Sequence, residues 1–272
     1  MAHPTIRAVR ETAATPRFDD ELAVATDAAK RAGRLQMERY ERLERIMHKG
    51  ERDVVTEVDT LSEELIISAL TGAFPGDSYL AEESGRSAAV ADRVWVIDPL
   101  DGTVNYANGI PVFCVSVGLA VGGQPAVGVI YDPVRDELFS AVAGRGARLD
   151  GTPIRQPKKE KISDLVLAMA MPARGWTRRE HEIRKRIRVS RILGSAALSL
   201  AYVGNGRFDG FIQAGGLSAW DICAAGLIAL EGGAVVTARD GGPWFDIARK
   251  SRSLGLLAAA PAYHATLLEL LA

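Results

Sequence analysis

VWVIDPLDGTVNY, residues 94–106, is the stretch around which the chain is organised. Its first four residues are apolar or aromatic and run into a turn that contains a proline and a glycine. Such a short apolar run is typical of a buried strand that brings its C-terminal end to a surface. Asp98 and Asp101 lie at that end, with Leu100 between them. Two carboxylates and a backbone carbonyl in this position suit a hard cation.

Gly102 and Thr103 follow the second carboxylate and open the next segment. Free backbone N–H groups at the start of a helix can bind an anion, and a glycine lets the backbone approach it closely. A cation site and an anion site at the same strand end predict phosphate chemistry.

Composition describes an ordinary globular protein. The 272 residues are 47% hydrophobic and 25% charged, which is enough for a full core. The net charge of -1 predicts no general attraction to nucleic acid or to an anionic membrane. Neither a signal peptide nor a run of 18 apolar residues is visible. Cys114 and Cys223 lie in apolar surroundings, which favours buried thiols over a disulfide. We therefore expect a cytoplasmic protein that needs neither nucleic acid nor membrane for its activity.

Two halves of one unit are predicted. Residues 1–17 contain two prolines and no apolar periodicity, which indicates a flexible tail. Residues 18–272 form the unit itself. A lysine-rich polar stretch near residue 156 divides it into an N-terminal half, about 18–155, and a C-terminal half, about 156–272.

The N-terminal half is predicted to begin with helices and to continue with strands. A stripe of small apolar residues indicates a helix from Phe18 to about Ile46, followed by a polar loop over 48–53. Residues 53–59 alternate as a strand would, and Asp59 is placed to cap a second helix. Gly-Gly and Asp-Pro turns then predict an antiparallel meander of three strands. The strands expected in it are 112–121, 126–131 and 137–142.

Carboxylates recur at strand ends and helix starts along the chain. They are Asp59, Glu82, Asp98, Asp101 and Asp221. Each alone is explained by a helix cap or a solvated charge. Together they indicate a cation site, because closely packed like charges are tolerable only around cations. The sequence holds no Gly-x-Ser-x-Gly nucleophile elbow, which favours water as the nucleophile.

Five motifs, taken in order, carry a resemblance to a known family. They are DVVTEVD at 53–59, AEESG at 81–85, WVIDPLDGTVN at 95–105, GSA at 194–196, and WD at 220–221 with GG at 232–233. In this combination the chain resembles the inositol monophosphatase family, within the lithium-sensitive, magnesium-dependent phosphatase superfamily. The resemblance implies an α+β fold, the layered α-β-α-β-α sandwich of the inositol monophosphatase and fructose-1,6-bisphosphatase type.

The resemblance also implies roles for individual residues. The metal ligands, for two or three Mg²⁺ ions, would be Glu82, Asp98, Asp101, Asp221 and the carbonyl of Leu100. The catalytic residues would be Thr103 and Asp59, which activate water, and Glu82. The substrate would be bound by Leu100, Asp101, Gly102, Thr103, Gly194, Ser195, Ala196, Gln213 and Asp221.

The implied reaction is Mg²⁺-dependent hydrolysis of a small phosphate monoester by metal-activated water, with myo-inositol 1-phosphate as the first candidate. Lithium inhibition and a homodimer are implied as well. One departure bears on the substrate: Gln213, or Ala214 with a one-residue gap, stands where the family's inositol enzymes usually have a glutamate that grips ring hydroxyls. An amide both donates and accepts, so the sugar-alcohol preference stays open. Arg191 could contact a substrate or a partner subunit, or form a surface salt bridge.

Alternatives remain within and outside this reaction. Within the superfamily they are phosphatases for histidinol phosphate, fructose 1,6-bisphosphate and 3′-phosphoadenosine 5′-phosphate, which share the metal motif. Outside it stands a non-catalytic regulatory protein that keeps the fold, for instance one associated with RNA polymerase. The intact set of carboxylates and Thr103 favours an enzyme.

Overall fold

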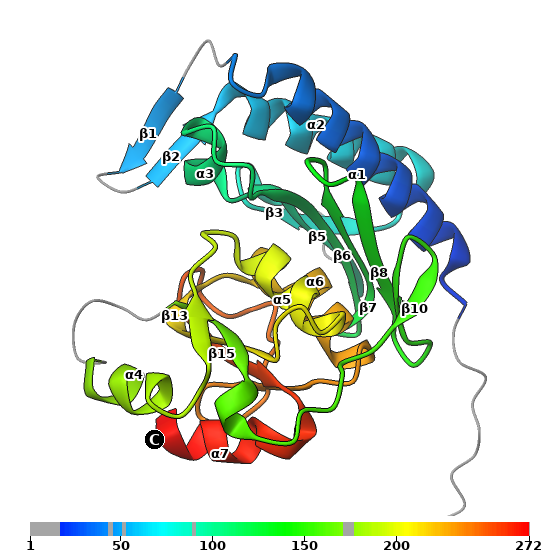
Figure 1. Ribbon diagram of the computed structural model, residues 1–272. Helices are drawn as coiled ribbons and strands as arrows, with labels where there is room; N and C mark the ends of the chain where they lie inside the picture. Colours follow the sequence, from blue (N-terminus) through cyan, green and yellow to red (C-terminus); the bar gives the residue numbers. More distant parts are fainter. Residues whose placement is uncertain (1–16, 43–45, 51–52, 89–90, 171–176, 272) are drawn as a thin grey trace, which may run out of the picture.

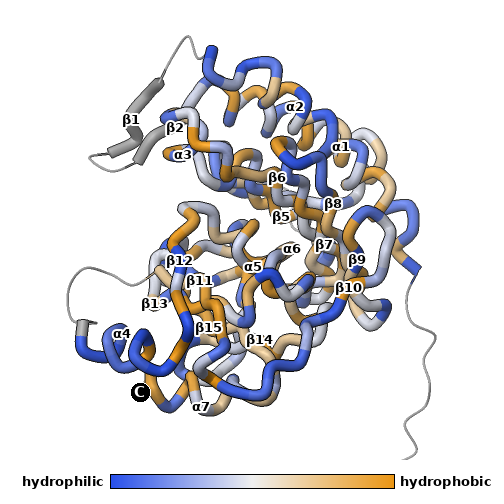
Figure 2. Tube along the Cα trace, viewed as in Figure 1, coloured by the Kyte–Doolittle hydropathy of each residue, from blue (hydrophilic) through white to orange (hydrophobic). Residues whose placement is uncertain are grey.

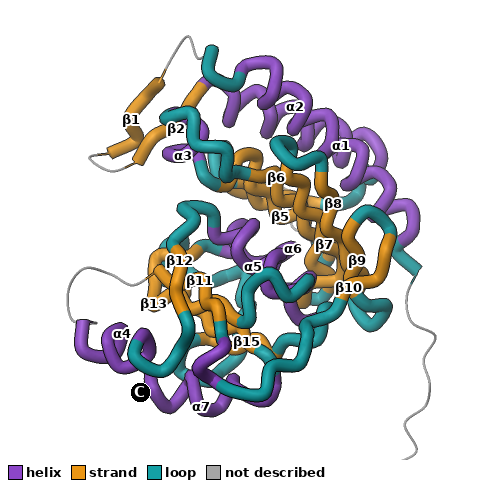
Figure 3. The backbone as a smooth tube through the Cα atoms, viewed as in Figure 1, coloured by secondary structure: helices purple, strands orange, loops and turns teal. Residues whose placement is uncertain are grey.

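Two large β-sheets and the helices packed on them form five layers in the order α-β-α-β-α (Figure 1). The computed structural model describes residues 17–42, 46–50, 53–88, 91–170 and 177–271. Only the backbone is described for 46–50, 53–55 and 177. Helical and strand layers alternate through the molecule (Figure 3). The fold class implied by the resemblance is confirmed. The predicted tail lies almost wholly outside the described residues.

Helices α1 (Asp19–Arg39) and α2 (Glu57–Ala73) form the outer layer of the N-terminal half. Small residues on α1 allow a close approach to the sheet. Gly33 is the extreme case, since a Cβ atom there would lie 2.5 Å from the ring of Tyr131. The buried alanines of α1 pack with Ile66 and Leu70 of α2 against the strands.

The larger sheet has eight strands in the order β10-β9-β8-β7-β6-β5-β3-β4. Their bounds are β3 (Ser78–Ala81), β4 (Gly85–Arg86), β5 (Arg93–Asp101), β6 (Cys114–Val121), β7 (Gln124–Asp132), β8 (Glu137–Val142), β9 (Ala147–Leu149) and β10 (Thr152–Ile154). β3 and β5 run parallel, and the other neighbours are antiparallel. The predicted meander is confirmed in β6, β7 and β8. The register of β5 against β6 shifts between Asp98 and Asp101, which bends the strand end that carries the motif.

The smaller sheet has five strands in the order β12-β11-β13-β15-β14. Their bounds are β11 (Val166–Ala170), β12 (Val189–Arg191), β13 (Gly210–Leu217), β14 (Val235–Ala238) and β15 (Leu254–Ala259). Helices α4 (Thr177–Arg184) and α7 (Pro261–Leu271) cover its outer face. A 3₁₀ turn (Ile162–Asp164) precedes β11. Within the described residues, no helix combines the length and the apolar character needed to span a bilayer.

Helices α5 (Ala196–Gly204) and α6 (Ala219–Glu231) form the middle layer between the two sheets. Both are apolar on nearly every side, as Figure 2 shows for α5, because sheets cover them from both faces. A Cβ atom at Gly118 of β6 would lie 2.7 Å from Cys223 Sγ, so α6 lies directly on the larger sheet. Cys114 and Cys223 are buried free thiols, as predicted.

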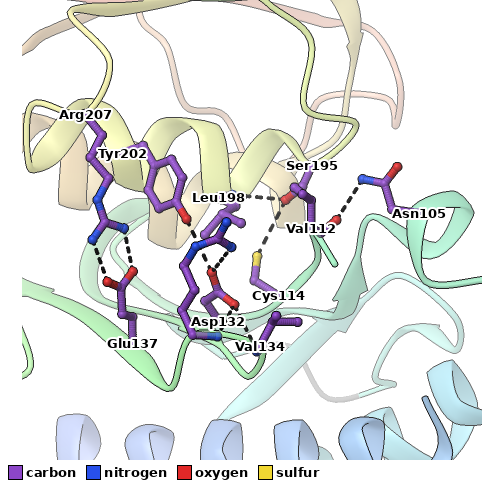
Figure 4. A network of polar contacts seen from close by, with 11 residues as sticks. Asn105, Val112, Cys114, Asp132, Val134, Glu137, Ser195, Leu198, Tyr202 and Arg207 are labelled. Atoms are coloured by element: carbon purple, nitrogen blue, oxygen red, sulfur yellow. Dashed lines mark hydrogen bonds and ion pairs between the residues drawn. The ribbon is translucent and has the colours of Figure 1, made fainter. Parts of the chain in front are cut away.

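Polar contacts tie α5 and its C-terminal turn to the end of β7 and the start of β8 in the larger sheet (Figure 4). The Tyr202 hydroxyl donates to the buried carboxylate of Asp132 at 3.3 Å. Arg207 forms a two-pronged ion pair with Glu137, and its guanidinium lies 4.7 Å from the centre of the Tyr202 ring. These contacts hold the helix that, at its other end, reaches the carboxylate motif.

The structure corrects two local predictions. The first helix ends at Arg39 rather than near Ile46, and part of the expected loop is strand β1 (Ile46–Gly50), paired with β2 (Asp53–Thr56). Tyr40 leaves the helix because its ring packs against Tyr106 and Phe113, a tertiary contact that outweighs local propensity.

The second correction concerns the start of α2. Thr56, not Asp59, is its N-cap, and Asp59 sits at the third helical position of a capping box. The predicted cap was wrong by three residues because a carboxylate can bond backwards to the cap as well as forwards.

Candidate active site

The turn at the end of β5 is fixed from several sides. The N–H of Leu100 donates to Asp98 Oδ1 at 3.0 Å. Gln36 of α1 is fully buried, and its side-chain amide donates to the carbonyl of Pro99 at 2.7 Å. The Tyr106 hydroxyl donates to the carbonyl of Gln36 at 2.7 Å. The backbone between the two aspartates is thus held by residues far away in the sequence.

Asp98, Asp101 and Asp221 converge at this turn. Each contributes one carboxylate oxygen to a group whose atoms all lie within 4.8 Å of one another. Burial, followed by the charges of Glu82, Asp101 and Asp221, raises the pKa of Asp98 well above its usual value. Burial and the charge of Asp101 likewise raise the pKa of Asp221 well above its usual value. This repulsion in an all-oxygen donor set fits a divalent cation, which would relieve it.

Asp101 is oriented by the start of α5. Its Oδ2 accepts hydrogen bonds from the Ser195 hydroxyl at 2.5 Å and from the N–H of Ala197 at 2.7 Å. Burial raises the pKa of Asp101, and these donors oppose the rise. Ser195 also caps α5 by accepting from the N–H of Leu198, and the Cys114 thiol points towards it (Figure 4). The Ser195 hydroxyl is therefore engaged by protein groups.

Asp221 is held by the start of α6. The N–H of Ser218 donates to Asp221 Oδ2 at 2.6 Å, as part of a capping box. The Ser218 hydroxyl accepts from the N–H of Arg252 at 3.0 Å, and the charge of Arg252 lowers the pKa of Asp221 against the larger effect of burial. The same sequence feature, a cap followed by an acid at the third position, thus presents Asp221 and Asp59.

Thr103 and Asp59 form a hydrogen-bonded pair beside the carboxylate cluster. The Thr103 hydroxyl lies 3.0 Å from Asp59 Oδ1 and 3.0 Å from the carbonyl of Leu100. Asp59 Oδ2 accepts from the Thr56 hydroxyl at 2.6 Å and from its N–H at 2.8 Å. The carboxylate is 1% exposed and fixed at both oxygens. Thr56 was not among the predicted site residues; the pattern Thr-x-x-Asp at a helix start was the signal for it.

Glu82 approaches from the turn between β3 and β4. Its N–H donates to the carbonyl of Ile97 at 3.2 Å, which continues the parallel pairing of β3 with β5. Its charge raises the pKa of both Asp98 and Asp221. Its carboxylate is not one of the three that converge within 4.8 Å.

Gly102 and Thr103 start a short helix, α3 (Thr103–Ala107). Gly102 has φ 100°, and a Cβ atom there would lie 2.9 Å from the carbonyl of Val112, so glycine is required. With five residues, α3 is short, so its dipole contributes little.

Asn105 of α3 connects the two halves at the site, a role that sequence reasoning missed. Its side-chain amide donates to the carbonyl of Val112 at 2.7 Å and to that of Leu193 at 2.8 Å. Gly194 has φ +79°, and a Cβ atom there would lie 2.8 Å from the Asn105 amide. Asn105 is the last residue of the motif at 95–105 on which the resemblance rests. Its place in that motif was the sequence signal that could have identified it.

A cavity of about 280 Å³ adjoins the carboxylate cluster. Asp101, Asp221, Gly194, Ala196 and Gln213 line it, as do apolar side chains of the smaller sheet. Ala214, the other position considered for the missing glutamate, is buried and does not line it. Arg191 is exposed at the cavity, and within the described part of the chain no carboxylate pairs with it.

Comparison with known proteins agrees with the fold. The model of the inositol monophosphatase family matches residues 19–272. Inositol monophosphatase 1 of Solanum lycopersicum is 37% identical over 232 residues, which cover 80% of this chain and 84% of that one. Nus factor SuhB of Pasteurella multocida is 38% identical over 230 residues, covering 81% and 86%. The crystal structure of extragenic suppressor protein suhB from Bartonella henselae superimposes with a TM-score of 0.87 at 33% identity, covering 93% of this chain and 98% of that one.

The fold and the buried acidic site define a metal-dependent phosphatase of the phosphoric monoester hydrolase class. The chain belongs to the inositol monophosphatase family.

Proposed function

We propose that this protein hydrolyses a small phosphate monoester, with myo-inositol 1-phosphate as the first candidate substrate. The observation that carries the proposal is the convergence of Asp98, Asp101 and Asp221 beside a cavity of small-molecule size. The inositol monophosphatase relatives support inositol phosphate as the substrate.

The proposed metal ligands are Glu82, Asp98, Asp101, Asp221 and the carbonyl of Leu100. Mg²⁺ is the proposed metal, with two or three ions, because every donor is a hard oxygen. When bound, Mg²⁺ would supply Lewis acidity towards the phosphate and a water of lowered pKa. Inhibition by Li⁺ belongs to the same proposal.

Thr103 and Asp59 would handle the proton of the attacking water. Asp59 Oδ1 accepts from the Thr103 hydroxyl, whose oxygen can then accept a hydrogen bond from water. The Thr56 donors hold Asp59 Oδ2 and so keep the other oxygen turned towards Thr103. The backbone N–H groups of Gly102 and Thr103 would bind the phosphate oxygens.

The alcohol part of the substrate would lie in the cavity between the cluster and the smaller sheet. The side chains of Asp221 and Gln213 could form hydrogen bonds with substrate hydroxyls. Gly194 and Ala196 line the same cavity. The Gln213 amide donates to the carbonyl of Gly215 at 3.2 Å, so its oxygen is turned to accept from a hydroxyl elsewhere. Ser195 would contribute through Asp101 rather than by direct contact.

Fructose 1,6-bisphosphate is the second candidate, favoured by Arg191. This exposed guanidinium lines the cavity and could pair with a second phosphate on the leaving alcohol. Histidinol phosphate and 3′-phosphoadenosine 5′-phosphate complete the set to be compared.

Release of phosphate from these four substrates, measured with Mg²⁺ in excess, tests the proposal. We expect the largest kcat/KM for myo-inositol 1-phosphate. A larger value for fructose 1,6-bisphosphate, lost in Arg191→Ala but not in Arg186→Ala, would move the assignment to the second candidate. No turnover of any of the four would contradict the proposal.

Cellular setting and assembly are part of the proposal. Two free, buried cysteines fit a reducing cytoplasm. A homodimer that acts without nucleic acid is proposed from family analogy. The relatives named Nus factor SuhB favour a regulatory role as the alternative from a different class.

A further inference from the structure

Helix α2 places a second buried carboxylate one turn after Asp59. Glu63 lies four residues further on, so both side chains project from the same face of the helix. Glu63 is 3% exposed. A carboxylate this deeply buried needs hydrogen-bond donors, and its donors identify what it does.

Both oxygens of Glu63 accept from the backbone of the turn that follows Glu82. The N–H of Glu83 donates to Oε2 at 2.9 Å, and the N–H of Ser84 donates to Oε1 at 2.8 Å. Hydrogen bonds to an ionised carboxylate are about twice as strong as those between neutral groups. The two bonds span 20 and 21 residues, so they fix the turn relative to α2 rather than shaping it locally.

The turn is held on its other side by the larger sheet. The N–H of Glu82 donates to the carbonyl of Ile97, directly before Asp98. Three successive N–H groups, those of residues 82, 83 and 84, are therefore fixed, two of them by Glu63. Gly85, with φ +79°, then turns the chain back into β4.

We propose that Glu63 is a positioning residue that holds the backbone of the Glu82 turn, so that the Glu82 carboxylate meets the aspartates at the metal site. The inference rests on the metal ligands proposed above. Asp59 and Glu63 thus let one helix face fix both the Thr103 pair and the Glu82 turn. Neither the sequence motifs nor the relatives assign this function to Glu63.

Glu63→Gln tests the inference, because an amide keeps the size but offers only one oxygen to the two N–H donors. Its NH₂ group would face one of those donors and push the turn away. We expect Mn²⁺ affinity, measured without substrate by the loss of the free-ion electron paramagnetic resonance signal, to fall about 10- to 100-fold. At saturating metal, kcat should recover most of its wild-type value.

Three further variants make the test specific. Glu64→Gln removes the neighbouring, exposed carboxylate and should leave Mn²⁺ affinity unchanged. Glu63→Asp keeps the charge but is one carbon shorter, and should lie between wild type and Glu63→Gln. In a Glu82→Ala background, Glu63→Gln should have no further effect, because its action passes through Glu82.

Unchanged Mn²⁺ affinity in folded Glu63→Gln and Glu63→Asp would overturn the inference, and so would effects of Glu63 and Glu82 that simply add. Mn²⁺ binding does not depend on turnover. The expected loss of Mn²⁺ affinity in Glu63→Gln, found in a protein whose wild type has no phosphatase activity, would therefore refute the proposed function and leave the role of Glu63 standing.

Discussion

Asp101 illustrates how hydrogen bonds orient a single buried carboxylate at the proposed cation site. Its Oδ2 is occupied by two donors from the start of α5, which restrict rotation of the carboxylate. The same donors oppose the rise in its pKa that burial causes. The carboxyl is therefore both oriented and kept closer to its charged form, which is the form that binds metal.

Ser195→Ala should weaken the metal site rather than substrate binding. The variant loses a hydrogen bond to a charged group, which typically contributes about 1.5–3 kcal/mol, and the Mg²⁺ concentration for half-maximal activity should rise about 10-fold or more. Activity titrated against Mg²⁺ and against substrate separates the two effects. Ser195→Thr, which keeps the hydroxyl, should restore the Mg²⁺ dependence. A raised KM for substrate with unchanged Mg²⁺ dependence would instead indicate direct substrate contact.

The carboxylates of the site could be predicted because they lie in compact motifs. Asp98 and Asp101 are three residues apart on one turn, and two carboxylates so close together indicate a cation site. Glu63 and Asn105 could not be recognised in this way. Glu63 bonds to Glu83, 20 residues away, and Asn105 reaches Leu193, 88 residues away, so these contacts exist only in the folded chain.

At the scale of elements, helix starts present the acids. Asp59 and Asp221 each occupy the third position of a capping box, where the carboxylate already serves the helix. The structural demands on these residues therefore coincide with the catalytic roles proposed for them. A change in the cap should accordingly affect both stability and activity.

Thr56→Val removes the N-cap hydroxyl of α2 while keeping the side-chain shape. The loss of its bond with the Val58 N–H should lower the free energy of unfolding by about 1 kcal/mol. The Asp59 carboxylate also loses a donor, so kcat should fall as well. Urea unfolding and steady-state rates measure the two effects. Thr71→Val, in the last turn of the same helix, is the control and should leave kcat unchanged; equal losses of kcat in both variants would contradict the account.

The boundaries of elements were harder to predict than their existence. Small residues on α1 marked the helix, but its end depends on Tyr40 meeting Tyr106 and Phe113. Among the residues that the structure describes, strand β1 pairs with β2 and no other strand, and its sequence lacks the alternation that identifies a strand. Sequence periodicity therefore predicts the elements that local sequence determines, but not the boundaries that tertiary contacts set.

At the scale of the whole molecule, the carboxylate site lies where a strand of the larger sheet ends and where helices of two other layers begin. The acids come from the larger sheet, from α2 and from α6, so the site forms only when both halves pack together. The layering followed from the resemblance and not from periodicity, since the pattern of one strand does not specify which distant strand it pairs with.

The metal-free protein should lose stability as the pH rises. The folded-state pKa values of Asp98 and Asp221 lie above the ordinary value of about 4. Between that value and the raised ones the folded protein binds more protons than the unfolded chain. Stability from these groups is therefore fully present below about pH 4 and lost as the pH rises through the folded pKa values.

Thermal unfolding at several pH values, in EDTA and in excess Mg²⁺, measures this effect. Mg²⁺ should raise Tm most at neutral pH, where the carboxylates repel one another. Asp98→Asn in EDTA should melt above the wild type at pH 7 and gain less from Mg²⁺. A Tm of wild type that does not respond to Mg²⁺ at any pH would argue against the cation site.

Phosphate release from myo-inositol 1-phosphate, compared between wild type and Asp98→Asn, is the decisive test of metal-dependent hydrolysis at this carboxylate cluster. We predict turnover by the wild type that requires Mg²⁺ and disappears with EDTA. We also predict that kcat/KM falls more than about 100-fold in folded Asp98→Asn. This loss exceeds the one expected for a residue that only supports a metal ligand. Undiminished hydrolysis by Asp98→Asn, or by wild type in EDTA, would contradict metal-dependent hydrolysis at this cluster.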